Sequence, residues 1–241
     1  MASLFGGLVL DAARFGSGFA KSAGVILASE IGDKTFFIAA IMAMRNPRVT
    51  VFAAAISALA VMTVLSAALG WAAPNLISKT YTHYACTALF FFFGLKSLYD
   101  FFFKKDVEGE ESELEQVEQE ISKGRTTPRE LEETSDGKNK ESTLSRVLGM
   151  LFSQIFLKAF TLTFLAEWGD RSQIATIGLA STEDVFGVTL GGILGHMVCT
   201  GAAVLGGRHL AEHIDERTIG MLGGLLFLGF GAHALYMGPE A

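Results

Sequence analysis

The sequence predicts an all-α polytopic membrane protein with six transmembrane helices, arranged as two inverted three-helix repeats that are joined by an acidic loop. Half of the 241 residues are hydrophobic and the mean hydropathy is +0.40, which is too apolar for an ordinary soluble domain. Apolar stretches long enough to cross a bilayer recur along the chain, and a short charged motif occurs twice, once in each half.

The expected spans each contain about 20 mostly apolar residues, the length that the hydrocarbon core requires. Polar or proline-containing segments separate them, as at 45–48, 181–184 and 208–217. The expected spans are 21–44, 50–72, 83–103, 152–180, 185–207 and 218–238. The corresponding divisions are an N-terminal segment at 1–20, a first repeat at 21–103, a linker at 104–150 and a second repeat at 151–241.

The linker differs in composition from the rest of the chain. Residues 104–146 contain 13 acidic and 8 basic side chains, so this segment accounts for most of the net charge of −6. The acidic balance therefore describes the linker rather than a substrate, and no nucleic-acid partner is expected. Leu114, Val117 and Ile121 recur at helical spacing and predict a short amphipathic helix in an otherwise solvated connection. The alternative for this segment is a regulatory or metal-sensing role.

The duplicated motif, E-x-G-D-[KR]-[ST], occupies residues 30–35 and 167–172. Charged side chains at the centre of a membrane helix cost about 2.5–3.5 kcal/mol each on insertion scales, so a chain that holds them twice is expected to use them. On a continuous helix the two acids and the base of each copy stand at i, i+3 and i+4, so we expect them to share one face. The structural alternative is a pair of i, i+4 ion pairs that only neutralise each other.

The two halves of the chain repeat. A shift of 137 residues aligns the two motifs and also aligns Phe93-Gly94 with Phe230-Gly231. Because each half has three expected spans, an odd number, the second half must enter the membrane inverted, with a site expected at the repeat interface. The distribution of Lys and Arg among the loops predicts a cytosolic 104–150 loop and places both termini on the opposite, luminal or external, face.

The motif residues predict a divalent-cation site. Two facing copies carry four carboxylates and two bases, for a net charge of −2, which matches a divalent cation and permits exchange for protons. Carboxylate and hydroxyl oxygens suit Ca²⁺ and Mn²⁺. The expected metal ligands are Glu30, Asp33, Glu167 and Asp170, with Thr35, Ser172 and Gln173 as secondary ligands and Lys34 and Arg171 as charge partners.

Other polar residues in the spans are weaker candidates. His196, Thr200 and Thr63 are candidates for lining a pathway, although a lone histidine among glycines is more often a hydrogen-bonded packing residue. The sequence offers no set of nucleophile, histidine and acid, so an enzyme is not expected. No resident cofactor is expected either.

The two motifs, together with the sequence at 36–45 and 162–173, resemble the transmembrane protein 165/Gdt family (uncharacterised protein family 0016) over about residues 20–238. The resemblance implies a Golgi-type antiporter that exchanges Ca²⁺ and Mn²⁺ for protons and supplies manganese-dependent glycosylation in the Golgi lumen. The partners it implies are Mn²⁺, Ca²⁺, H⁺ and the lipid bilayer, while a homodimer stays open. The alternatives are a passive divalent-cation channel or uniporter, or a chloroplast or plasma-membrane manganese transporter of the same family.

Overall fold

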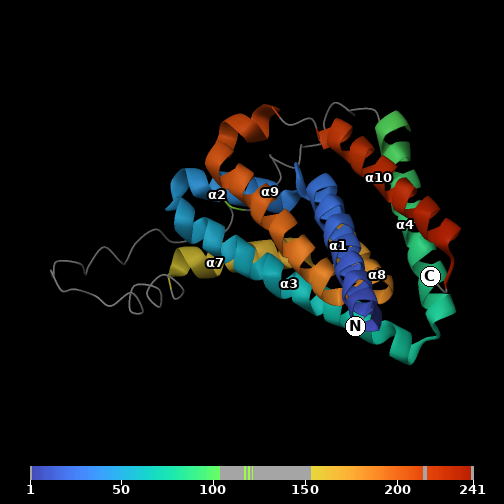
Figure 1. Cartoon of the computed structure of the whole chain (residues 1–241). Helices are drawn as coiled ribbons and strands as arrows, with labels where there is room; N and C mark the ends of the chain where they lie inside the picture. Colours follow the sequence, from blue (N-terminus) through green and yellow to red (C-terminus); the bar gives the residue numbers. More distant parts are fainter. Residues whose placement is uncertain are drawn as a thin grey trace, which may run out of the picture.

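The computed structural model describes residues 2–103, 117, 119, 121, 153–213 and 216–239, and their regular structure is helical throughout (Figure 1). Side chains are described for these residues except those at 2–10, 75–76, 208–213 and 216–217. The helices, in chain order, are α1 (Ala2–Glu30), α2 (Lys34–Arg45), α3 (Arg48–Leu76), α4 (Lys79–Phe103), α7 (Gln154–Glu167), α8 (Arg171–Thr182), α9 (Val185–His213) and α10 (Glu216–Met237). The all-helical prediction is confirmed.

Within the described residues, four helical stretches are long and apolar enough to cross a membrane. They are Arg48–Pro74 in α3, Lys79–Phe103 in α4, Val185–Gly207 in α9 and Thr218–Met237 in α10. They agree with four of the six expected spans. The apolar part of α9 ends at Gly207, whose backbone, with φ of 52°, is not helical.

The prediction of continuous helices over 21–44 and 152–180 is wrong. α1 ends at Glu30 and α2 begins at Lys34, and in the same way α7 ends at Glu167 and α8 begins at Arg171. Each break falls inside the charged motif. The first helix also starts well before the expected span, because α1 extends back to Ala2.

The two halves of the chain pack reciprocally. α1 and α2 pack against α9 of the second half, while α7 and α8 pack against α3 of the first half. α4 and α10, the last helices of the two halves, lie side by side, and Figure 1 shows this pair as the green and red ribbons. Each broken helix therefore lies against the long helix of the other half, which brings the two motif copies toward each other.

Glycines set the close approach of α9 to α1. A Cβ atom built on Gly191 would lie 2.3 Å from the carbonyl oxygen of Phe19, and one on Gly195 would lie 2.9 Å from the Cβ of Ile26. No side chain fits at the first of these contacts without moving a backbone. The second contact, at Ile26, fixes the register of α1 against α9 one helical turn before Glu30.

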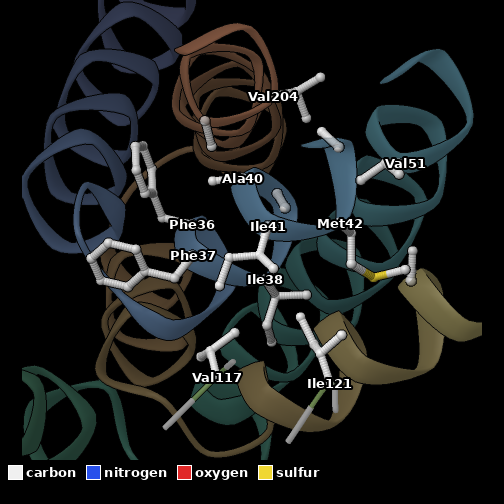
Figure 2. Close-up of a cluster of buried hydrophobic side chains, with 14 of the residues drawn as sticks. Phe36, Phe37, Ile38, Ala40, Ile41, Met42, Val51, Val117, Ile121 and Val204 are labelled. Atoms are coloured by element: carbon white, nitrogen blue, oxygen red, sulfur yellow. The ribbon is translucent and has the colours of Figure 1, made fainter. Parts of the chain in front are cut away.

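The helix that follows the first motif is buried on every side. The side chains from Thr35 to Ala43 in α2 are all buried, as expected of a helix that is apolar all round. Figure 2 shows Val117 and Ile121 of the linker beside Ile38 of this helix, with Val204 of α9 on its other side. The two linker residues are helical and only 1% and 7% exposed, so this part of the linker is packed rather than solvated. The third residue of the predicted amphipathic helix, Leu114, lies outside the described residues.

Candidate cation site

The first motif copy forms a junction between two helices. α1 ends at Glu30, and Gly32 has a φ of +79°, the left-handed conformation that glycine adopts without a Cβ penalty. Asp33 then has an extended backbone and is the N-cap residue of α2. The glycine of the motif thus turns the chain out of one helix, and the aspartate begins the next.

The second copy repeats this junction, and two side-chain hydrogen bonds stabilise it. α7 ends at Glu167, and Gly169 has a φ of +82°. Asp170 is the N-cap residue of α8, and its Oδ2 accepts a hydrogen bond from the Ser172 backbone N–H at 2.9 Å. The side chain of Gln173 closes the turn, because its Oε1 accepts from the Gly169 N–H at 2.7 Å. Both polar side chains satisfy backbone donors that the break leaves free.

The breaks overturn the expectation that the two acids and the base of each copy share a face of one helix. In both copies the glutamate is the last residue of one helix, and the base is the first residue of the next. The i, i+4 ion-pair alternative also fails in its helical form, because no helix runs through the motif. The junctions place two helix N-termini, those of α2 and α8, beside the motif acids, where their backbone dipoles favour negative charge.

Each motif glutamate is held by the hydroxyl of its own copy. Thr35 donates to Oε2 of Glu30 at 3.1 Å, and Ser172 donates to Oε1 of Glu167 at 2.5 Å. Both glutamates are 2% exposed. The threonine and serine of the motif therefore orient the carboxylates, a positioning role beside the secondary-ligand role expected from the sequence.

Three carboxylates from the two copies converge. Glu30, Asp33 and Glu167 each offer an oxygen, and these oxygens lie within 4.8 Å of one another. Calcium binds oxygen at about 2.3–2.6 Å, so oxygens on opposite sides of one ion stand about 4.6–5.2 Å apart. The cluster therefore has the dimensions of a single-ion site.

Each glutamate of the cluster has one carboxylate oxygen without a compensating contact in the described part of the chain. Oε1 of Glu30 and Oε2 of Glu167 are buried and have no hydrogen-bond partner among the described residues. Burying an acceptor without a partner costs about 1–3 kcal/mol, and more when it is charged. Each glutamate thus has one oxygen that accepts from a hydroxyl and one oxygen with no partner within the described ranges, and both oxygens keep a lone pair for a cation or a proton.

One basic side chain links the two halves at the site. Nη2 of Arg171 lies 3.8 Å from Oδ1 of Asp33, so the base of the second copy faces an acid of the first. Three carboxylates and one guanidinium sum to −2 when all are ionised, which is the complement of a divalent cation. Lys34 is half-buried in the first turn of α2.

The structure thus gives different roles to the residues predicted for the site. Glu30, Asp33 and Glu167 form the carboxylate cluster, whereas Asp170 stands outside it as a helix cap. Gln173 stabilises the break in the second copy. Nδ1 of His196 lies 3.9 Å from Oε2 of Glu30. In the sequence His196 is only a weak candidate, indicated by its place in an apolar, glycine-rich span.

The similarity to known proteins extends over both halves of the chain. The family profile described as "Divalent cation/proton antiporter GDT1" matches residues 18–105 and 155–241, one match in each half. "GDT1-like protein 5" of Arabidopsis thaliana is 52% identical over 93% of this chain and 97% of its own length. "GDT1-like protein 4" of Arabidopsis thaliana is 50% identical over 93% and 97%, and "GDT1-like protein 5" of Oryza sativa subsp. japonica is 49% identical over 92% and 96%. No solved structure matches. The chain is therefore an integral membrane protein that belongs to the GDT1 family of divalent cation/proton antiporters, a family of transporters rather than enzymes.

Proposed function

We propose that this protein exchanges Mn²⁺ or Ca²⁺ for protons at one site formed by Glu30, Asp33 and Glu167. The observation that supports this most strongly is the convergence of three carboxylates from both motif copies, two of them with a buried, unpartnered oxygen within the described residues. Oxygen ligands of this kind suit hard divalent cations.

Exchange follows from competition for the same oxygens. A metal ion binds the ionised carboxylates, so proton binding weakens metal binding and metal binding releases protons. Acidification on one face therefore promotes metal release on that face. The net charge of −2 is compensated by one divalent cation or by two protons, which lets the site carry either cargo without leaving an uncompensated charge in the membrane.

The site lies at mid-depth of the membrane-spanning body. His196 is the central residue of the apolar stretch Val185–Gly207 and lies beside Glu30. Together the broken pairs α1–α2 and α7–α8 supply the two further crossings, which completes six spans in two inverted repeats. Broken helices whose ends meet near the midplane are a recurring arrangement in secondary transporters.

Alternating access arises from rocking of one half against the other. The reciprocal contacts of α1 and α2 with α9, and of α7 and α8 with α3, favour this motion, because each motif copy is attached to the opposite half. A small rotation between the halves separates the carboxylates of the two copies, weakens the cluster and opens it to one face. The glycine junctions allow the half-helices to tilt without breaking further hydrogen bonds.

The proposed membrane is that of the Golgi, with the 104–150 loop in the cytosol and both termini in the lumen. The excess of Lys and Arg on the loop side supports this orientation. Import of Mn²⁺ into the acidic lumen would serve manganese-dependent glycosylation and the balance of Ca²⁺, Mn²⁺ and pH. Comigration of the tagged protein with Golgi markers tests the location, and comigration with chloroplast or plasma-membrane markers would contradict it.

The exchange reaction is tested in proteoliposomes. We expect an acidic interior to drive uptake of Mn²⁺ and Ca²⁺ above equilibrium by the wild type, with uptake at least about tenfold lower in Glu30→Gln. Asp100→Asn, which changes a half-buried carboxylate of α4 that is not part of the cluster, is the matched control and should retain uptake. Flux that ignores the proton gradient and never exceeds equilibrium would instead identify a channel or uniporter.

A further inference from the structure

A buried histidine reaches the carboxylate cluster from α9. Nδ1 of His196 lies 3.9 Å from Oε2 of Glu30, and the histidine is 4% exposed. Its position is fixed by the close contact between α9 and α1, in which Gly195 meets Ile26 one turn before Glu30. The imidazole of His196, on α9, therefore stands at the level of the Glu30 carboxylate, at the end of α1.

The nearest ring nitrogen has no partner. Nδ1 of His196 is buried and makes no hydrogen bond with any described residue, and a separation of 3.9 Å is too long for a hydrogen bond to Glu30. His83, the other buried histidine of the described part of the chain, instead contacts the Ala234 carbonyl oxygen through Nε2 at 3.1 Å. His196 is thus not the hydrogen-bonded packing residue that a lone histidine usually is.

The distance fits two atoms that bind one ion. With metal–ligand bonds of about 2.0–2.6 Å, adjacent ligands stand roughly 3 Å apart and opposite ligands roughly 4–5 Å apart. The Nδ1–Oε2 distance of 3.9 Å lies between these limits. An ion on the Glu30 side of the cluster would therefore lie within reach of the imidazole, although His196 is not among the residues whose ligand atoms all lie within 4.8 Å of one another.

We propose that His196 is a fourth ligand of the transported cation and that it biases the site toward Mn²⁺ over Ca²⁺. This inference rests on the proposed function. Calcium takes oxygen ligands almost exclusively, whereas di-manganese and di-iron carboxylate proteins combine glutamate with histidine in one coordination sphere. An imidazole in the cluster adds affinity for a transition ion and leaves Ca²⁺ with a less suitable neighbour.

The direct test is pulsed electron paramagnetic resonance of Mn²⁺ bound to the purified full-length protein, with any purification tag removed. We expect nitrogen modulation from a directly bound imidazole in the wild type, and its loss in His196→Gln. His83→Gln is the matched control and retains the modulation. Labelling the wild type with ¹⁵N-histidine changes the modulation without any substitution, which keeps the test valid if His196→Gln does not fold.

Transport selectivity provides the second readout. In proteoliposomes we expect His196→Gln to raise the KM for Mn²⁺ more than the KM for Ca²⁺. The ratio of the two KM values should change by at least about tenfold, the usual scale for disturbing a metal site. Bound Mn²⁺ without nitrogen modulation, or an equal loss for both ions, would overturn the role of His196 and leave the carboxylate site intact. A wild type that binds Ca²⁺ but no Mn²⁺ would likewise overturn the role of His196, and one that binds neither ion would overturn both proposals together.

Discussion

The helix break in the second motif copy depends on one backbone conformation, and Gly169→Ala tests it in isolation. Gly169 has a φ of +82°, and a Cβ atom built there meets nothing within 4 Å. The substitution therefore creates no clash, and its whole effect comes from placing an L side chain in the left-handed region. That conformation costs a non-glycine residue about 1–2 kcal/mol.

The same chemical change elsewhere provides the control. Gly229 lies inside α10, and a Cβ atom there also meets nothing within 4 Å. Replacing a glycine with alanine in a helix interior stabilises it by roughly 0.5–1 kcal/mol. We therefore expect Gly169→Ala to lower the free energy of unfolding by about 1–2 kcal/mol and Gly229→Ala to raise it slightly. Gly169→Asn should fall between Gly169→Ala and the wild type, because asparagine tolerates the left-handed region better.

Thermal unfolding of the purified protein, read from intrinsic fluorescence, measures these differences, and Mn²⁺ uptake measures their consequence for the site. A relaxed break also moves Glu167, the last residue of α7, so uptake should fall together with stability. Equal unfolding temperatures for Gly169→Ala and Gly229→Ala would show that the left-handed turn is not required, and the account of the motif glycine would be wrong.

Three further predictions concern the contacts that place the site and the residues that bind the ion. Gly191→Ala puts a Cβ atom 2.3 Å from the Phe19 carbonyl oxygen, so it should destabilise the protein by about 1–3 kcal/mol or more. Gly201→Ala, with its nearest neighbour at 3.7 Å, should not, and size-exclusion chromatography after heating compares the two. Asp170→Ala removes a helix cap and should cost about 1 kcal/mol of stability, most of it restored in Asp170→Asn. Asp33→Asn should weaken Mn²⁺ binding more than Asp170→Asn does in equilibrium titration, and the reverse order would return Asp170 to the ligand set.

Sequence reasoning found the motif and the repeat because both are local patterns. The spacing of apolar residues located α3, α4, α9 and α10 within a few residues. The helix breaks at the motif were missed because a single glycine in an apolar stretch is equally compatible with close helix packing. The left-handed backbone of Gly32 and Gly169 depends on the tertiary surroundings of the junction, which the residue composition does not predict.

The different roles of the polar residues could not be predicted from the sequence either. Asp33 and Asp170 occupy equivalent motif positions, yet only Asp33 joins the carboxylate cluster, while Asp170 caps a helix. The approach of His196 to Glu30 comes from contact between α9 and α1, which are far apart in the sequence. The burial of Val117 against α2 likewise depends on a long-range contact, which the acidic composition of the linker does not predict.

The arrangement of the cluster has a genetic consequence. Duplicated segments often provide a spare, so that damage to one copy is tolerated. Here both copies contribute carboxylates to one cluster, with Glu30 from the first copy and Glu167 from the second. Under the proposed function the duplication confers no redundancy, and an inactivating allele in either half is expected to be equivalent to one in the other. Two alleles damaged in different halves would restore function only if intact halves from separate chains assembled into one transporter.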